Sequence, residues 1–136
     1  VGSGGGMPGI PTAICRPDIQ ITLLDSHSKK TSFLSQAVIE LGLSNVKVIT
    51  GRVEAAEGIA FDAITSRAFA ELRDFVTLTP QLLGENGRWL AMKGVHPYEE
   101  IAQLPEDVHV TQVDKLNVPS LEAERHMVII QKGAAA

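Results

Sequence analysis

The stretch that most constrains this chain is its opening, VGSGGGMPGIP, which places a run of glycines ahead of two prolines. Glycine accepts positive φ and has no Cβ, so such a run lets backbone N–H groups close around a ligand. Pro8 and Pro11 suit the first turn of a helix, because the backbone N–H that proline lacks makes no helical hydrogen bond there. The stretch therefore predicts a glycine loop followed by a helix, whose positive end faces the ligand of the loop.

The length, composition and cysteine count fit one domain in a reducing compartment. With 136 residues, of which 44% are hydrophobic, the chain can bury a core without disulfides, and its lone cysteine, Cys15, cannot form an internal one. No secretory or membrane-spanning segment is visible, which predicts a cytoplasmic protein. The net charge of −4 argues against coating nucleic acid by bulk electrostatics, although a local basic face is allowed.

The two ends of the chain carry separate expectations. The strand that should feed the glycine loop is absent, so we expect that an upstream segment of a longer protein precedes Val1. Residues 1–132 are expected to form one domain, and residues 133–136 a frayed tail without function.

Strands and helices are predicted to alternate along most of the chain. Hydrophobic spacing and turn residues predict helices near 8–15, 26–41 and 72–83, and strands near 19–24, 46–50, 61–66 and 88–92. Ser26 is a possible helix cap, Gly42 a helix end, and Pro80 a kink. Phe33, Leu34, Ala37, Val38 and Leu41 would form the apolar face of the second helix.

The last part of the sequence breaks this alternation. Residues 108–118 and 125–132 both alternate like strands, and the connection between them is too short for a crossover helix. The final pair is therefore predicted to be antiparallel, at the end of an otherwise parallel α/β sheet.

In such sheets ligands bind beyond the carboxyl ends of the strands. This rule brings the glycine loop together with Asp25, which ends the second predicted element, and a carboxylate there can accept from both hydroxyls of a ribose. The ligand is then a nucleoside-bearing cofactor, either a nicotinamide dinucleotide or S-adenosylmethionine. A dinucleotide fingerprint would need glycine where Met7 stands, and the antiparallel last strand also favours the methyl donor, but the glycines alone leave the two nearly even.

Several segments also resemble one known family in order and spacing. They are VGSGGGMPGIP, LLDSHSKKTSFL, GRVEAAE, FDAITSRAFA, LAMKG and ERHMVII. Together they are similar to the bacterial small-subunit ribosomal RNA guanine-N7 methyltransferases, also called glucose-inhibited division protein B, over residues 1–132. The resemblance implies a Rossmann-like class I methyltransferase, with a mostly parallel twisted sheet, an antiparallel last strand and helices on both faces. It also implies methyl transfer from S-adenosylmethionine to N7 of one guanine in 16S ribosomal RNA.

The resemblance further assigns roles to individual residues. Those expected to bind the cofactor are Gly2, Gly4, Gly6, Met7, Asp25, Val53, Glu54 and Arg67. Asp25 would hold the ribose, Val53 and Glu54 the adenine side, and Arg67, also the catalytic candidate, would close the pocket on the substrate side. Candidates for RNA phosphate or guanine contact are Lys29, Lys30, Arg52, Lys93 and Arg125.

The residues present fit the chemistry of a ring nitrogen. Methylating an exocyclic amine usually uses a polar-Pro-Pro-aromatic turn, but the corresponding segment reads Ser66-Arg67-Ala68-Phe69. Methylating a pyrimidine carbon needs a nucleophilic cysteine, and Cys15 lies on the first helix instead. Guanine N7 has an in-plane lone pair and no proton to lose, so it needs only alignment with the methyl group and exclusion of water.

Plainer interpretations stand beside these roles. Asp25 could cap a helix, Lys29 and Lys30 could form a solvated helix face, and Glu99 and Glu100 read as solvated helix charge. Phe69 and Trp89 are expected in the core, and Cys15 as a small buried hydrophobe. The four histidines lack metal-ligand spacing, so no metal is predicted. The rival functions are a nicotinamide-dependent oxidoreductase and a truncated, non-catalytic cofactor-binding module.

Overall fold

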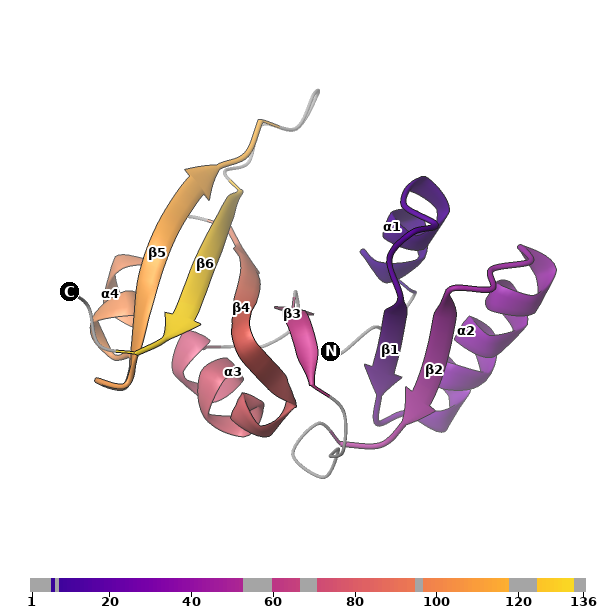
Figure 1. Ribbon diagram of the computed structural model, residues 1–136, viewed down its shortest axis with the longest axis horizontal. Helices are drawn as coiled ribbons and strands as arrows, with labels where there is room; N and C mark the ends of the chain where they lie inside the picture. Colours follow the sequence, from indigo (N-terminus) through magenta and orange to yellow (C-terminus); the bar gives the residue numbers. More distant parts are fainter. Residues whose placement is uncertain are drawn as a thin grey trace. The chain divides into compact units, whose positions relative to one another are not determined.

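A computed structural model describes residues 6, 8–52, 60–66, 71–94, 97–117 and 125–133 of the chain (Figure 1). The chain divides into two compact units, Val1–Ala56 and Glu57–Ala136.

The first unit is a two-stranded parallel sheet with helices. Its elements in order are α1 (Gly9–Cys15), β1 (Ile21–Asp25), α2 (Ser28–Glu40) and β2 (Val46–Thr50). In the register of the two strands Ile21 lies opposite Val46 and Asp25 opposite Thr50, so both strands end at the same edge. The predicted elements are confirmed here to within about two residues at each boundary.

The buried side chains of the first unit lie where helices meet the sheet. Ala13 of α1, Leu23 of β1 and Leu34 of α2 are each at most 4% exposed. A Cβ built on Gly9 would lie 2.2 Å from a methyl carbon of Leu23, so glycine lets α1 pack close to β1. The buried Asn45 donates to the carbonyls of Ala13, Arg16 and Ile19, and thereby ties the end of α1 to the start of the sheet.

Several local predictions for this unit are corrected. Helix α2 begins at Ser28 with His27 as its N-cap, and no side chain caps it, so Ser26 is not the cap. Phe33 and Leu41 are 58% and 53% exposed, because the buried face of α2 consists of Thr31 and Leu34. Cys15 is exposed at the last position of α1. Gly42 does end the helix, at a φ of 63°.

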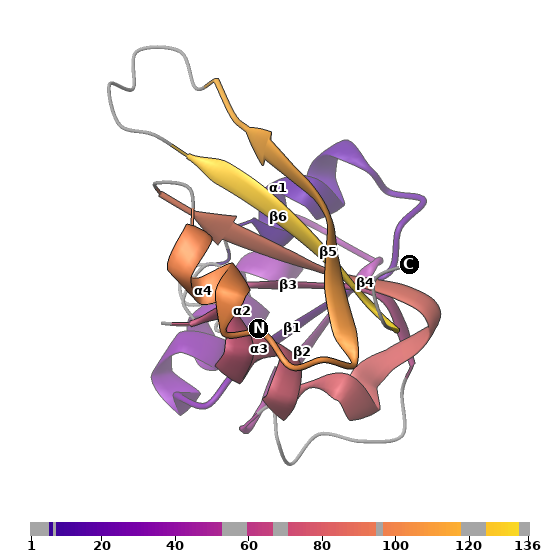
Figure 2. The same ribbon diagram turned by 90° about the vertical axis from the view of Figure 1, so that its left-hand side faces the viewer.

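The second unit is a four-stranded mixed sheet. Its elements are β3 (Phe61–Ser66), α3 (Leu72–Leu78), a 3₁₀ turn η2 (Pro80–Leu82), β4 (Leu83–Lys93), α4 (Tyr98–Ala102), β5 (Val108–Lys115) and β6 (His126–Lys132). The strand order is β3-β4-β6-β5, as Figure 2 shows from the side of β5 and β6. Strands β3 and β4 are parallel, whereas β6 runs antiparallel to both β4 and β5. The prediction of an antiparallel last strand is confirmed.

Two boundaries in this unit differ from those predicted. Helix α3 ends at Leu78, and Pro80 begins a separate 3₁₀ turn, because proline cannot continue the hydrogen bonding of the helix. Strand β4 starts at Leu83 and passes through the predicted turn, since an irregularity in its pairing with β3 takes up the extra residues. Asn86 has a φ of 71° within it.

The core of the second unit centres on Trp89 of β4, which is fully buried as predicted. Its Nε1–H donates to Oγ1 of Thr79 at 2.7 Å, and the hydroxyl of Thr79 donates to the carbonyl of Phe75 at 2.6 Å. The indole N–H thereby has a hydrogen-bond partner in the buried core. Within the described ranges, no helix is long and apolar enough to cross a membrane.

Candidate cofactor and acceptor sites

Gly6 is the part of the glycine loop that the structure describes. Its φ is 93°, a conformation that favours glycine, and a Cβ there would lie 2.6 Å from Cδ1 of Ile10 and 3.1 Å from a methyl carbon of Leu34. Its carbonyl accepts from the N–H of Ile10 at 2.7 Å. The loop therefore closes directly onto the start of α1, and its last glycine has no room for a side chain.

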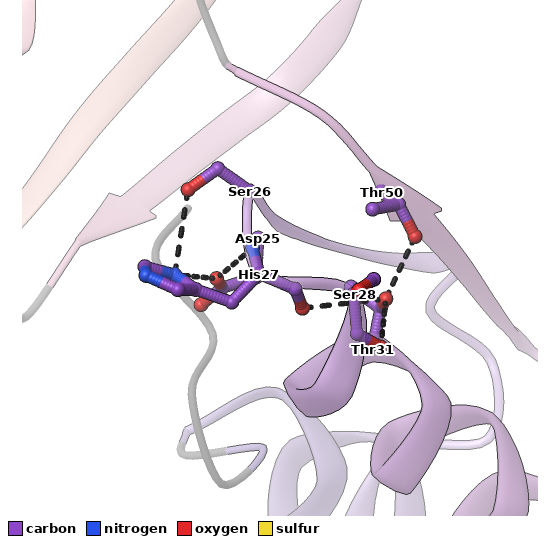
Figure 3. Close-up of polar contacts among 6 residues, drawn as sticks. All are labelled: Asp25, Ser26, His27, Ser28, Thr31 and Thr50. Atoms are coloured by element: carbon purple, nitrogen blue, oxygen red, sulfur yellow. Dashed lines mark hydrogen bonds and ion pairs between the residues drawn. The ribbon is translucent and has the colours of Figure 1, made fainter.

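Asp25 lies at the carboxyl end of β1, and its carboxylate shapes the turn into α2. Its Oδ1 accepts from the backbone N–H of His27 at 2.9 Å and lies 3.1 Å from Nδ1 of the same residue (Figure 3). The side chain of Asp25 is only 6% exposed, whereas that of His27 is 68% exposed. Asp25, which is predicted to bind the ribose, therefore also holds the turn that precedes α2.

A second contact fixes α2 against the sheet at the same edge. Oγ1 of Thr31, in the first turn of α2, lies 2.7 Å from Oγ1 of Thr50 at the end of β2 (Figure 3). The N–H of Gly51 donates to the carbonyl of Asp25 at 2.9 Å. The carboxyl ends of β1 and β2 and the start of α2 therefore form one connected edge, as expected of a nucleoside site in a parallel sheet.

The predicted basic residues fall into two groups. Lys29 and Lys30 in α2 and Arg52 after β2 are exposed, and all three lie next in sequence to the edge that carries Asp25. Arg125 is exposed ahead of β6 in the second unit. Lys93 differs from the other four in exposure, because its side chain is only 14% exposed. Its Nζ lies 2.8 Å from Oε1 of Glu100.

Glu100 is the residue that the sequence analysis missed. It reads as solvated helix charge in the sequence, but its side chain is 27% exposed, and its Oε1 also accepts from the backbone N–H of Leu72 at 3.0 Å. Glu99 beside it is exposed, as predicted. No local pattern could reveal the contact of Glu100, because its partners are seven residues before it in β4 and twenty-eight residues before it in α3.

Several predicted site residues lie outside the described residues. They are Gly2, Gly4, Met7, Val53, Glu54 and Arg67, and Phe69 lies outside as well. Their roles stay predictions. Among the described residues, no three His, Cys, Asp or Glu side chains are grouped so that they could hold a metal ion.

One pair of charged groups with shifted pKa values lies away from this edge. Hydrogen bonding to Arg16 lowers the pKa of Asp18, and the same bond raises the pKa of Arg16. The two side chains are exposed, and NH2 of Arg16 lies 2.8 Å from Oδ2 of Asp18. This surface pair follows α1 and takes no part in the candidate site.

The comparison with protein families decides among the cofactor classes. The sequence profile of the GidB family, described as rRNA small subunit methyltransferase G, matches residues 1–128. The chain belongs to this family. Membership in the rRNA small subunit methyltransferase G family confirms the resemblance read from the sequence and sets aside the nicotinamide alternative.

Curated relatives and solved structures agree with this assignment. Ribosomal RNA small subunit methyltransferase G of Neisseria meningitidis serogroup B is 64% identical over 132 residues, which are 97% of this chain and 64% of that protein. The chain therefore spans just under two thirds of the length of that relative. Mitomycin 7-O-methyltransferase MmcR superposes with a TM-score of 0.78 at 14% identity, over 97% of this chain and 47% of that one. A mutant of MtNAS in complex with S-adenosylmethionine superposes with a TM-score of 0.73 at 17% identity, over 97% and 52%. The fold is thus the Rossmann-like class I methyltransferase fold, as predicted.

Proposed function

We propose that this chain is the cofactor-binding core of an enzyme that transfers a methyl group from S-adenosylmethionine to N7 of a specific guanine in 16S ribosomal RNA, in the cytoplasm. Membership in the rRNA small subunit methyltransferase G family is the observation that carries the proposal. The proposal treats residues 1–132 as one methyltransferase domain, with the ribosomal RNA or the small ribosomal subunit as its partner and without a metal.

The described residues fit this cofactor. Gly6 has a φ of 93° and no room for a Cβ, so the loop that leads into α1 requires glycine at this position. Asp25 presents a nearly buried carboxylate at the end of β1. A carboxylate can accept about four hydrogen bonds, so one group can both hold the turn at His27 and accept from ribose hydroxyls. In the MtNAS structure S-adenosylmethionine is bound by a protein of the same fold.

The bound cofactor supplies an electrophilic methyl group on a sulfonium. The chain then has to orient the ribose through Asp25, hold the adenine side through Val53 and Glu54, and line the methionine side with Gly2, Gly4, Gly6 and Met7. Arg67 would close the substrate side and bond to O6 of guanine or to a phosphate, for which its two-pronged guanidinium is suited. No general base is required, because N7 of guanine carries no proton.

RNA would be held by exposed cations. Lys29, Lys30, Arg52 and Arg125 are exposed and would neutralise phosphates, which would make affinity for RNA salt-dependent despite the net charge of −4. Lys93 is the weakest of the five candidates, because its side chain is only 14% exposed, whereas the other four residues are exposed.

Calorimetric titration with S-adenosylhomocysteine tests the cofactor assignment. Three variants of the chain separate the roles of Asp25: Asp25→Ala removes the carboxylate, Asp25→Asn keeps an oxygen for the N–H of His27, and Asp18→Asn removes an exposed carboxylate elsewhere. Losing one hydrogen bond to a charged group costs about 1.5 kcal/mol or more, so Asp25→Ala should weaken binding at least about tenfold. Asp25→Asn should fall between Asp25→Ala and the wild type, and Asp18→Asn should match the wild type.

The outcomes separate the alternatives. Equal affinity in Asp25→Ala and Asp18→Asn would contradict the ribose role. A chain that binds S-adenosylhomocysteine but transfers no methyl group would be the non-catalytic module. Transfer is therefore measured in the chain and also in a chimera, in which the chain replaces the matching 132 residues of the Neisseria meningitidis relative.

A further inference from the structure

A row of basic side chains crosses β4, β6 and β5 at one end of the second sheet. In the register of this sheet, His126 of β6 lies opposite Lys93 of β4 on one side and opposite Lys115 of β5 on the other. Residues opposite one another on neighbouring strands share a face of the sheet and lie about 5 Å apart. Lys93 and Lys115 end their strands and His126 begins its own, so the row marks one end of the three strands (Figure 2).

The inner part of the row is held within the fold. His126 is 6% exposed, and its Nδ1 lies 2.7 Å from the carbonyl oxygen of Gly94. A carbonyl oxygen only accepts, so Nδ1 carries the proton of this hydrogen bond. The side chain of Lys93 is 14% exposed, and Glu100 balances its charge at 2.8 Å. The exposed cation of the row is therefore Lys115, at its outer position.

Arg125 adds a second exposed cation at the same end of the sheet. Its carbonyl accepts from the N–H of Leu116 at 2.8 Å, so the pairing of β5 with β6 continues by one residue beyond the row. Strand β5 is the last in the order β3-β4-β6-β5. Lys115 and Arg125 thus lie at an outer corner of the sheet, and the two residues are called the basic corner below.

The acidic neighbour of Lys115 lies on the other face of the sheet. Asp114 is opposite Met127 in the register, and its two carboxylate oxygens accept from Nε2 of Gln112, each at 2.7 Å. Successive residues of a strand point to opposite faces. The carboxylate of Asp114 therefore does not lie between Lys115 and an anion that approaches the face of Lys115.

We propose that the basic corner binds phosphates of the 16S ribosomal RNA substrate, with Lys115 as a contact that the sequence patterns did not single out. This inference rests on the proposed function. Because the net charge of the chain is −4, a polyanion is attracted only where cations gather. Lys93, in the same row, ends β4, and ligands of such sheets bind at the carboxyl ends of parallel strands such as β3 and β4. RNA held at the basic corner borders that edge.

The salt dependence of RNA binding measures this contact. Filter binding of protein-free 16S RNA by the chimera with the Neisseria meningitidis relative is measured at a series of KCl concentrations. Each phosphate contact contributes about 0.7–0.9 to the slope of log affinity against log salt concentration. Lys115→Gln should reduce the slope by that amount, which weakens binding about 5- to 8-fold at about 0.1 M salt and leaves it unchanged near 1 M.

Three further variants separate charge from position. Lys115→Arg keeps the charge and should keep the slope of the wild type. Lys132→Gln is the matched control, because Lys132 is exposed at the opposite end of β6, where it lies opposite Val108, and its slope should also match the wild type. The double variant with Lys115→Gln and Arg125→Gln should lose about twice the slope that Lys115→Gln loses.

Steady-state methyl transfer distinguishes a binding contact from a structural role. The substrate is the small ribosomal subunit lacking the modification. Lys115→Gln should raise the KM for this subunit about fivefold at about 0.1 M salt and leave kcat within about twofold, because a phosphate contact holds ground state and transition state alike. The KM for S-adenosylmethionine should stay at the wild-type value.

The contrary outcomes are distinct. Equal slopes for Lys115→Gln and Lys132→Gln overturn the inference, because the effect would then belong to the total charge or to neither residue. A raised KM for the subunit with unchanged affinity for protein-free RNA overturns it too, since the basic corner would then contact a ribosomal protein. In both cases the proposed function stands. A wild-type chimera that binds RNA but transfers no methyl group overturns the proposed function instead.

Discussion

The hydroxyl of Thr79 allows a quantitative test of the core of the second unit. Thr79 and Trp89 are both fully buried, and the hydroxyl serves as acceptor for the indole N–H and as donor to the carbonyl of Phe75. Thr79→Val preserves the shape of the side chain but leaves the indole N–H without a partner. An unsatisfied buried donor costs about 1–3 kcal/mol, and the lost bond to Phe75 adds about 1 kcal/mol. The substitution should therefore lower the free energy of unfolding by about 2–4 kcal/mol.

Urea unfolding measures this loss directly. Trp89 is the only tryptophan of the sequence, so its fluorescence reports on the environment that the substitution changes. Thr77→Val is the matched control, because Thr77 is exposed and donates only to the carbonyl of Asp74, and its effect should stay within about 0.5 kcal/mol. The midpoint should fall for Thr79→Val with an unchanged m value.

A double-mutant cycle isolates the shared hydrogen bond. In a Trp89→Phe background no indole N–H remains, so Thr79→Val should cost about 1–2 kcal/mol less than in the wild type, as measured by circular dichroism. The reasoning is refuted if Thr79→Val and Thr77→Val destabilise the chain equally, or if the cycle shows no coupling.

Three further predictions concern the first unit. Asn45→Ala should lower the free energy of unfolding by about 2–3 kcal/mol in urea, because three carbonyls lose their donor at a buried position. An effect below about 0.5 kcal/mol would contradict this. Gly42→Ala should lower the free energy of unfolding by about 1 kcal/mol, because the φ of 63° at this position strains alanine even though a Cβ there meets no atom. An unchanged urea midpoint would refute this conformational reason. The pKa of Asp18 is lowered by Arg16, so this pair stabilises the folded chain above the unfolded pKa of Asp18 and ceases to do so as the pH falls through the folded pKa. An Arg16→Gln variant should therefore raise the pKa of Asp18 in an NMR titration, and an unmoved pKa would exclude that cause.

The sequence predicted the ends of those helices and strands that a residue within or next to the element determines. Gly42 ends α2 because its left-handed conformation suits glycine, and β1 ends at Asp25, where the alternation of apolar residues stops. The short connection between β5 and β6 predicted their antiparallel pairing, because no crossover helix fits within it. The rule that the carboxyl ends of parallel strands share an edge brought Asp25 to the predicted site, whereas the roles of the other site residues came from the family resemblance.

Contacts between distant residues could not be predicted in this way. Strand β4 begins at Leu83 rather than at Arg88 because its pairing with β3 tolerates an irregularity, which no single strand reveals. Glu100 reads as one more surface charge until the fold brings Lys93 and Leu72 to it. Phe33 fits the helical spacing of an apolar face, but the buried residues of α2 are Thr31 and Leu34.

Mapping the methylated atom tests the central claim most directly. Small ribosomal subunits lacking the modification are incubated with the chimera and S-adenosylmethionine. Their 16S RNA is then reduced and treated with aniline, which breaks the strand at N7-methylated guanine but not at unmethylated guanine. The account predicts one new cleavage site, and weaker cleavage there for an Asp25→Ala variant when S-adenosylmethionine is below saturation. Methyl incorporation without cleavage would place the methyl group on another atom and contradict the account.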